Sequence, residues 1–280
     1  MGIVRNIVAL GVGLAALVPS DEVLADSKSG YSLFRPTPEH LLRELSADRP
    51  DKTESARTVD AGWFQWETQL LGVAVDRGGG HSTRTWSFLP VHFRIGLLNS
   101  LELDLDYGGY SRFHSVRSGE RGVEHGEFSV GFKWNVVGND SDSFALAVMP
   151  YLSFPRHGHG VGGGAVNGGI CFPWSIPLPG NWEMGMTHGV HFSPREKVRG
   201  DRATFTNSVS FSRPLFGNLS GYVEFFSEVS TDGNDPWIGT VDTGITYQIN
   251  RNLQLDCGVN IGVTAGADEW EPFIGLTWRF

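Results

Sequence analysis

Charged side chains recur at every second position along much of this 280-residue chain. From Leu101 to Tyr107 the sequence reads LELDLDY, so three carboxylates alternate with apolar side chains. Successive side chains of a β-strand point to opposite faces, and these carboxylates therefore share one face. Such a face can line a hydrated path for solutes or hold an ion-pair network. The same alternation assigns to this polar face Glu67, Arg84, Arg94, Glu102, Asp104, Asp106, Lys133, Glu183, Glu224, Asp242 and Asp256.

The acidic residues on the polar face outnumber the basic ones. Crowded carboxylates repel one another unless they are paired or hydrated, so we expect Arg84, Arg94 and Lys133 to lie against some of them. Two interpretations stay open at this point. The face lines a path, or it forms a satisfied internal network with no part in transport.

Other chemistries have weaker support. The sequence has no G-x-S-x-G motif and no compact Ser/His/Asp group, and His92 and His191 would form a dyad with carboxylates only by chance juxtaposition. His157 and His159 lack a third ligand in their loop, so we expect no metal there. The G-x-G-x-x-G spacing of the same loop is not part of a βαβ unit and predicts no nucleotide site. The sequence therefore predicts no enzymatic activity and no cofactor.

The elements that position the polar face are β-strands. Runs such as FSVGFKWNV and LQLDCGVNIGV alternate apolar and polar residues over more positions than the usual strand of about 5–6 residues. The predicted strands are residues 62–76, 83–96, 100–111, 126–137, 143–156, 166–176, 181–193, 203–214, 219–230, 237–249, 252–264 and 272–280.

The connections between these strands fall into two alternating classes. Short turns such as LLNS, PLPGN and NRN alternate with generally longer polar or glycine-rich loops such as DRGGGHS and SPREKVRGDR. Short turns at one end and long loops at the other are typical of an outer-membrane barrel. We therefore predict an all-β protein: a transmembrane, antiparallel, up-and-down β-barrel of about 12 strands in the bacterial outer membrane. A soluble β-sandwich is the alternative, but it leaves the two loop classes unexplained.

The N-terminus has the features of a secretory signal peptide. Arg5 precedes the apolar run from Ile7 to Val18, which is shorter than the about 20 residues of a spanning helix, and cleavage is predicted after Ala25. The formal net charge of −9 gives no support to nucleic-acid binding. Alternation places Cys171 toward the lumen and Cys257 toward lipid, so no disulfide is expected between them.

Between the signal peptide, residues 1–25, and the barrel, residues 61–280, lies a charged segment, residues 26–60. Its stretch TPEHLLRELS predicts a short helix. The stretch ADRPDKTES carries too many charges to face lipid. We expect it to enter or cross the periplasmic mouth, where Arg49 could pair with the acidic lumen. A disordered periplasmic tail is the alternative.

The charged stretch and the residues after it form the sequence LSADRPDKTESARTVDAGWFQWE. It resembles the N-terminal signature of a bacterial outer-membrane transporter family named for the MetA-pathway of phenol degradation. Ala56 departs from the signature, which has proline there. The final residue, Phe280, resembles the assembly signal of outer-membrane barrels, which implies the barrel assembly machinery as a partner. The residues that carry the signature's first part are Asp48, Arg49, Pro50, Asp51, Thr53 and Ser55.

The resemblance implies transport of small molecules, often aromatic. Together with the polar, acidic face it predicts a monomeric barrel in contact with outer-membrane lipid. Such a barrel would pass small solutes, aromatic or hydrophobic ones among them, by passive uptake through its lumen. The alternative is a structural or surface ligand-binding barrel whose lumen is closed.

Overall fold

The computed structural model describes residues 28–77, 82–116, 118–141, 143–154, 166–194, 200–233 and 235–280. The chain divides into two compact units, Met1–Gly30 and Tyr31–Phe280. The first is described only at its end, the short 3₁₀ helix η2 (Lys28–Gly30), so the predicted signal peptide lies outside the described residues. Among the described residues, no helix is long and apolar enough to cross a membrane.

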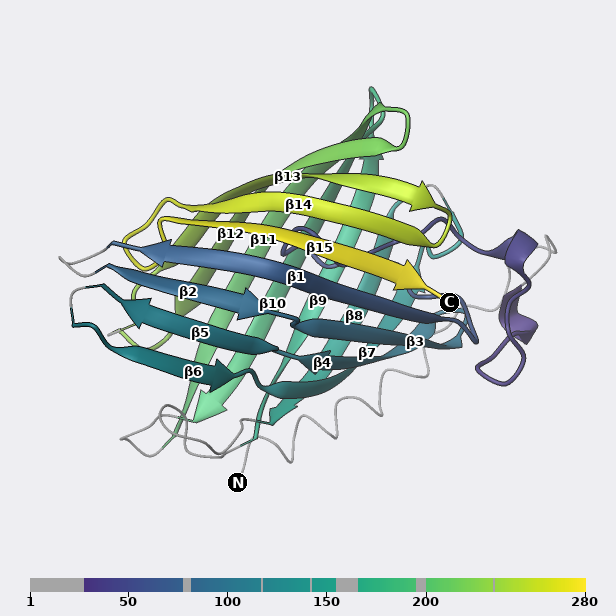
Figure 1. The fold of residues 1–280 in the computed structure, drawn as a ribbon. Coiled ribbons are helices and arrows are strands. Elements are labelled where there is room, and N and C mark those ends of the chain that lie inside the picture. The colour runs from purple at the N-terminus through teal and green to yellow at the C-terminus, as the bar shows by residue number, and fades with distance from the viewer. Residues whose placement is uncertain are drawn as a thin grey trace. The chain divides into compact units, whose positions relative to one another are not determined.

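The second unit is one antiparallel sheet that closes on itself, because the last strand pairs with the first (Figure 1). A second 3₁₀ helix, η3 (Glu39–Leu41), precedes the sheet. The strands are β1 (Phe64–Asp76), β2 (Thr83–Phe88), β3 (Val91–Leu98), β4 (Leu101–Tyr107), β5 (Tyr110–Ser115), β6 (Arg121–His125), β7 (Phe128–Val137), β8 (Ala145–Phe154), β9 (Asn167–Leu178), β10 (Trp182–Pro194), β11 (Asp201–Phe216), β12 (Leu219–Ser230), β13 (Ile238–Asn250), β14 (Leu253–Gly262) and β15 (Trp270–Arg279).

At three strand positions of the barrel wall, two shorter strands lie end to end and together cross the wall. β2 and β3 both pair with β1, β5 follows β2 in the sheet as β4 follows β3, and β6 and β7 continue the two rows. When each of these three pairs is counted as one strand, the 15 strands form a closed 12-stranded barrel, which confirms the predicted fold. The sequence predicted a loop between residues 111 and 126, so it missed β6 and the part of β5 beyond Ser111.

The barrel has apolar side chains outside and polar ones inside. On β15 the exposed Ile274 and Trp278 alternate with the buried Phe273, Thr277 and Arg279. The largest fully buried side chains include Arg94, Lys133, Glu67 and Glu102. This arrangement is the reverse of that in a soluble protein, whose apolar side chains are inside. It is the arrangement expected of a barrel with lipid around it and a polar lumen.

A break in the wall corrects one prediction. Leu89, between β2 and β3, has a φ of 50°, and the alternation shifts by one residue there. The lumen-facing Gln69 donates through Nε2 to Ser87 Oγ at 2.9 Å, so Ser87 faces the lumen and its neighbour Trp86 points outward. Arg84 shares the face of Trp86 and is exposed. The prediction that Arg84 lines the lumen is therefore wrong.

The short turns and the C-terminus lie at the same end of the barrel. Strands β3–β4, β9–β10, β11–β12 and β13–β14 are joined there by two or three residues. In outer-membrane barrels this end faces the periplasm, and we call it the periplasmic end.

The helix predicted over TPEHLLRELS is wrong. Only the single 3₁₀ turn η3 forms, and the backbone is already extended at Leu42. The next amide, Arg43 N, donates to Asp60 Oδ2 at 3.0 Å instead of to a helical carbonyl. A helix this short is marginal, so contacts with the rim decide the conformation.

Candidate functional site

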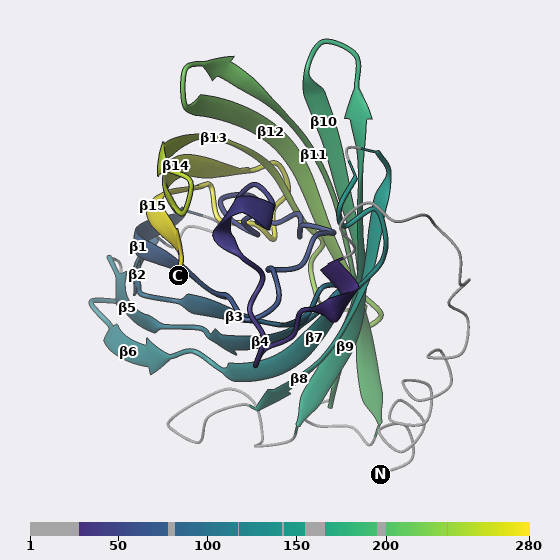
Figure 2. The same ribbon diagram turned by 90° about the vertical axis from the view of Figure 1, so that its right-hand side faces the viewer.

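The chain ahead of β1 runs inside the barrel. Residues 46–60, which we call the inner segment, cross the lumen and return, as the view through the barrel shows (Figure 2). Both ends of the segment are held at the periplasmic rim. Arg43 Nη1 donates to Asn99 Oδ1 at 2.9 Å, and Gly62 N donates to Gly96 O at 2.8 Å.

Asp48 is the centre of the contacts on one side of the lumen. Its Oδ2 lies 2.6 Å from Lys133 Nζ, 3.1 Å from Arg94 Nη1 and 3.3 Å from His92 Nε2. The backbone amide of Asp48 donates to Glu67 Oε2 at 2.9 Å. One carboxylate of the inner segment thus meets three basic groups from strands β3 and β7.

Arg94 joins the wall to both limbs of the inner segment. Its Nη2 lies 2.8 Å from Glu102 Oε1, and its Nη1 lies 3.0 Å from Glu67 Oε1. Nη1 also donates to Ser46 O and Nη2 to Arg57 O, each at 2.8 Å. Because Arg94 is fully buried, its charge depends on these partners for solvation.

The cations of the inner segment reach the opposite wall. Arg49 Nη2 pairs with Asp256 Oδ1 at 2.9 Å, and the guanidinium lies over the ring of Phe273.

Two further side chains of the segment contact strands β12 and β13. Lys52 Nζ pairs with Asp242 Oδ2 at 3.0 Å and lies over the ring of Phe226. Thr53 Oγ1 donates to Glu224 Oε1 at 2.5 Å. The inner segment is therefore bonded to both sides of the wall.

The carboxyl groups of the inner segment titrate very differently from one another. Burial would raise the pKa of Asp48, but the charges of Arg94 and Lys133 hold this pKa well below its usual range. No basic group lowers the pKa of Asp51, and the charges of Lys133 and His92 lower the pKa of Glu54 only in part. Burial raises the pKa of Asp51 to about 7 and that of Glu54 to about 8. Near neutral pH these two groups exchange protons while Asp48 stays charged.

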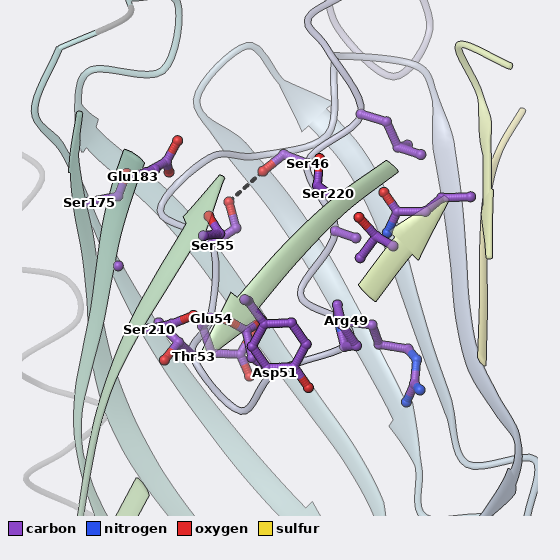
Figure 3. Close-up of a pocket in the computed structure, with 18 of the residues that line it drawn as sticks. Ser46, Arg49, Asp51, Thr53, Glu54, Ser55, Ser175, Glu183, Ser210 and Ser220 are labelled. Carbon is purple, nitrogen blue, oxygen red and sulfur yellow. Dashed lines mark hydrogen bonds between the residues drawn. The ribbon is translucent and has the colours of Figure 1, made fainter. Parts of the chain in front are cut away.

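A cavity of about 230 Å³ lies between the inner segment and the wall (Figure 3). Its lining is mostly hydroxyl and carboxyl groups from both sides, with Arg49 the one basic residue among the lining residues. From the segment come Ser46, Asp51, Thr53, Glu54 and Ser55, and from strands β9 to β14 come Ser175, Glu183, Ser210, Ser212, Ser220, Tyr222, Thr246 and Gln254.

Glycines on the inner face make room for the inner segment. A Cβ on Gly96 would lie 2.1 Å from Asp60 O, an atom of the backbone. We expect Gly96→Ala to push the returning limb from the wall and to destabilise the protein by about 1–3 kcal/mol, as overpacking does. The measurement is the temperature at which the folded, fast-migrating gel band converts to the unfolded band.

Gly185→Ala is the matched control. Its Cβ would meet only the methyl group of Thr53, at 3.2 Å, so a small shift of one side chain relieves the contact. An equal loss of stability for the two variants would contradict the close fit that we describe at Gly96.

The structure places the predicted polar-face residues as follows. Glu67, Arg94, Glu102, Asp104, Lys133, Glu224, Asp242 and Asp256 are buried in the lumen. Asp106 contacts His92, and Glu183 lines the cavity. Arg84 alone of the set is outside.

The residues considered for other chemistry are also placed. His92 is enclosed by Asp48 and Asp106, and the His191 ring stacks on Tyr151, whose hydroxyl is 3.1 Å from Nδ1. Among the described residues no group of three or more His, Cys, Asp or Glu side chains is arranged to hold a metal. His157 and His159 lie outside the described residues. Both cysteines are free.

Sequence reasoning missed several contributors to the site. Arg279 donates to Asn252 Oδ1 at 2.9 Å and to Arg43 O at 3.0 Å, which ties the last strand to the chain ahead of β1. Because Arg279 stands between Trp278 and Phe280, its position on the polar face could have been predicted from the alternation. The serines of the cavity also stand at inward positions, but serine is too common in loops and strands to be singled out.

The chain matches the family model of the MetA-pathway of phenol degradation over residues 47–280. No curated protein matches it. Among solved structures, it is similar to the COG4313 outer membrane channel from Pseudomonas putida F1, with 9% identity and a TM-score of 0.60 over 84% of this chain and 100% of that chain. A looser likeness, with 13% identity and a TM-score of 0.48 over 78% of this chain and 90% of that chain, is to the transport unit of the autotransporter AIDA-I from Escherichia coli.

The match covers the inner segment except Ser46, and it covers the whole closed wall with the terminal phenylalanine. Of the contacts described above, those of Arg43 and Ser46 lie outside the matched residues. This protein, a 12-stranded outer-membrane-type β-barrel with its N-terminal chain bonded inside the lumen, therefore belongs to the family of the MetA-pathway of phenol degradation.

Proposed function

We propose that the protein is a passive channel for small solutes, narrowed by its own inner segment. The cavity between the segment and strands β9 to β14 carries the proposal. In this proposal solutes pass beside the segment through the polar cavity, whereas the side toward β3, β4 and β7 is filled by Asp48, Arg94 and Lys133.

The chemistry of the cavity favours solutes that donate hydrogen bonds. Its lining supplies many acceptor oxygens, and Glu54 Oε2 has no hydrogen-bond partner among the described residues. Nearby in the lumen, Asp242 Oδ1 has none either. Cations and hydroxyl-bearing molecules are the solutes that such oxygens attract. The family description names phenol degradation, and a phenol is a small aromatic molecule with one hydroxyl to offer.

A conductance measurement distinguishes the channel from the alternative, a structural or surface ligand-binding barrel with a closed lumen. Purified protein in a planar bilayer should show discrete conductance steps with cation preference if it is a channel. A folded, inserted protein that stays silent would contradict the channel and favour the alternative.

Cation preference should depend on pH. Because the pKa values of Asp51 and Glu54 are raised to about 7 and about 8, both groups are largely neutral at pH 6 and ionised at pH 9. They add negative charge to the cavity as pH rises, so the reversal potential in a KCl gradient should shift toward stronger cation selectivity from pH 6 to pH 9.

The double variant Asp51→Asn/Glu54→Gln should lose most of this shift. Glu120→Gln, in an exposed turn outside the lumen, is the matched control and should keep it. A double variant with the full shift would show that other groups set the selectivity of the path.

A further inference from the structure

Three arginines stand together on the outer face of β2, β5 and β6. Arg84 on β2 is opposite His114 on β5, which is opposite Arg121 on β6. In the next row Trp86 is opposite Arg112. All three arginines are exposed, and we call Arg84, Arg112 and Arg121 the basic face.

The arginines of the basic face have no ion pair or side-chain hydrogen bond to another described residue. The lumen arginines differ, since Arg94 contacts Glu102 and Arg202 contacts Asp235. Two acidic groups are close in sequence. Glu124 stands on the opposite face of β6, across from Ser111, and the exposed Glu120 precedes Arg121 in the turn. The chain has a net charge of −9, so these unpaired guanidinium groups form a local positive cluster on a protein that is acidic as a whole.

The basic face lies beyond the apolar band of the barrel. A strand tilted by about 40° advances about 2.5 Å along the barrel axis per residue. Arg84 is 14 residues from Leu98, the periplasmic end of β3, and Arg112 is 11 residues from Leu101, the periplasmic end of β4. These offsets place them about 28–35 Å above that end, against an apolar band about 25 Å tall. Figure 1 shows β2, β5 and β6 at the end of the barrel opposite the C-terminus.

Aromatic side chains lie just below the basic face. Phe88 and Tyr110 form a cross-strand pair with ring centroids 6.1 Å apart, and Tyr110 contacts His125 at 5.5 Å. Rings of this kind mark the boundary between hydrocarbon and headgroups. The guanidinium groups therefore stand at the height where lipid headgroups of the outer leaflet begin.

We propose that the basic face binds the phosphate groups of lipopolysaccharide in the outer leaflet. Guanidinium groups bind phosphate through paired, charge-assisted hydrogen bonds, and these three are free to make them. Three arginines on neighbouring strands at headgroup height match a lipid A headgroup, which carries phosphates above its acyl chains. Phe88, Tyr110 and the apolar outer wall then contact those chains.

Lipid binding to the purified protein tests the proposal. Protein in detergent is titrated with phosphorylated lipid A and with the same lipid A lacking its phosphates, and bound lipid is counted by native mass spectrometry. We expect the wild type to prefer the phosphorylated lipid by on the order of tenfold, and Arg84→Gln/Arg112→Gln/Arg121→Gln to lose that preference.

Arg213→Gln is the matched control, because Arg213 is also on the outer face but at the periplasmic end, over the ring of Trp182. It should keep the wild-type preference. If the triple variant does not fold, as judged by gel mobility before and after heating, Arg112→Gln carries the test with a smaller expected loss.

Three outcomes would overturn the proposal. The triple variant keeps the preference for phosphorylated lipid A, the wild type binds both lipids equally, or inorganic phosphate displaces lipid A at matching concentration. The last result would mean that the basic face binds free phosphate and not the glycolipid.

Discussion

Removal of residues 37–60 should leave a folded barrel whose conductance is on the order of tenfold higher than that of the full-length protein. The wall does not need these residues, because its hydrogen-bonded strands begin at Phe64 and are closed by the pairing of β1 with β15. The lumen does need them to stay narrow, since the inner segment occupies it from Ser46 to Asp60 (Figure 2).

Cation preference should grow in the same deletion. Arg49 and Lys52 leave with the segment, so the wall carboxylates Asp256 and Asp242 lose the cations that neutralise them. The deletion also removes acidic groups, but burial keeps Asp51 and Glu54 partly neutral near pH 7 in the full-length protein. The wall that remains carries more carboxylates than basic groups, and its field favours cations.

Single-channel recording in a KCl gradient measures both effects. The matched control is a deletion of residues 31–36, which contact the rim and leave the inner segment in place, and it should conduct like the full-length protein. A folded deletion of residues 37–60 with unchanged conductance would mean that the segment does not limit the path.

Strand periodicity was enough to predict the barrel and most of the lumen residues. Alternation is a local property, so Glu102, Lys133 and Asp256 could be assigned to the inner face from their immediate neighbours. The error at Arg84 arose where local rules fail. Proline is disfavoured within paired strands, so Pro90 in the middle of a long run was the signal that the alternation could break.

The partners of the charged residues could not be predicted. Asp48 meets Lys133 across 85 positions and Arg49 meets Asp256 across 207, so these pairs depend on the register of the whole sheet. The helix failed for a related reason. Its residues include good helix formers, but a helix this short is marginal, and Asp60 bonds the amide that would have continued it.

Replacing Arg94 by methionine should release the inner segment from the wall. Arg94 is fully buried and contacts carboxylates of β1, β4 and the inner segment, besides the carbonyl oxygens of Ser46 and Arg57. Removing the cation leaves Glu67, Glu102 and Asp48 with only Lys133 and His92 to neutralise them. Breaking a buried ion pair from one side costs about 3–5 kcal/mol.

That cost falls on the docked state of the segment, because an undocked lumen fills with water that solvates the same carboxylates. A cost of this size shifts the ratio of undocked to docked protein by more than about a hundredfold. Trypsin reports the shift, since it cleaves after Lys52 and Arg57 only when the segment leaves the lumen, and the cleavage rate follows the undocked population.

Arg202→Met is the matched control for this variant. Arg202 is also a lumen-side arginine, but it pairs with Asp235 and Ser193 on the wall and its loops, not with the inner segment. It should leave trypsin cleavage of the segment unchanged. If Arg94→Met does not fold, Arg94→Met/Glu102→Gln removes one cation and one anion together and restores the charge balance. A folded Arg94→Met protein cleaved at the wild-type rate would show that the segment is held by its contacts with Asp256, Asp242 and Glu224 on the opposite wall, and that Arg94 serves only the wall.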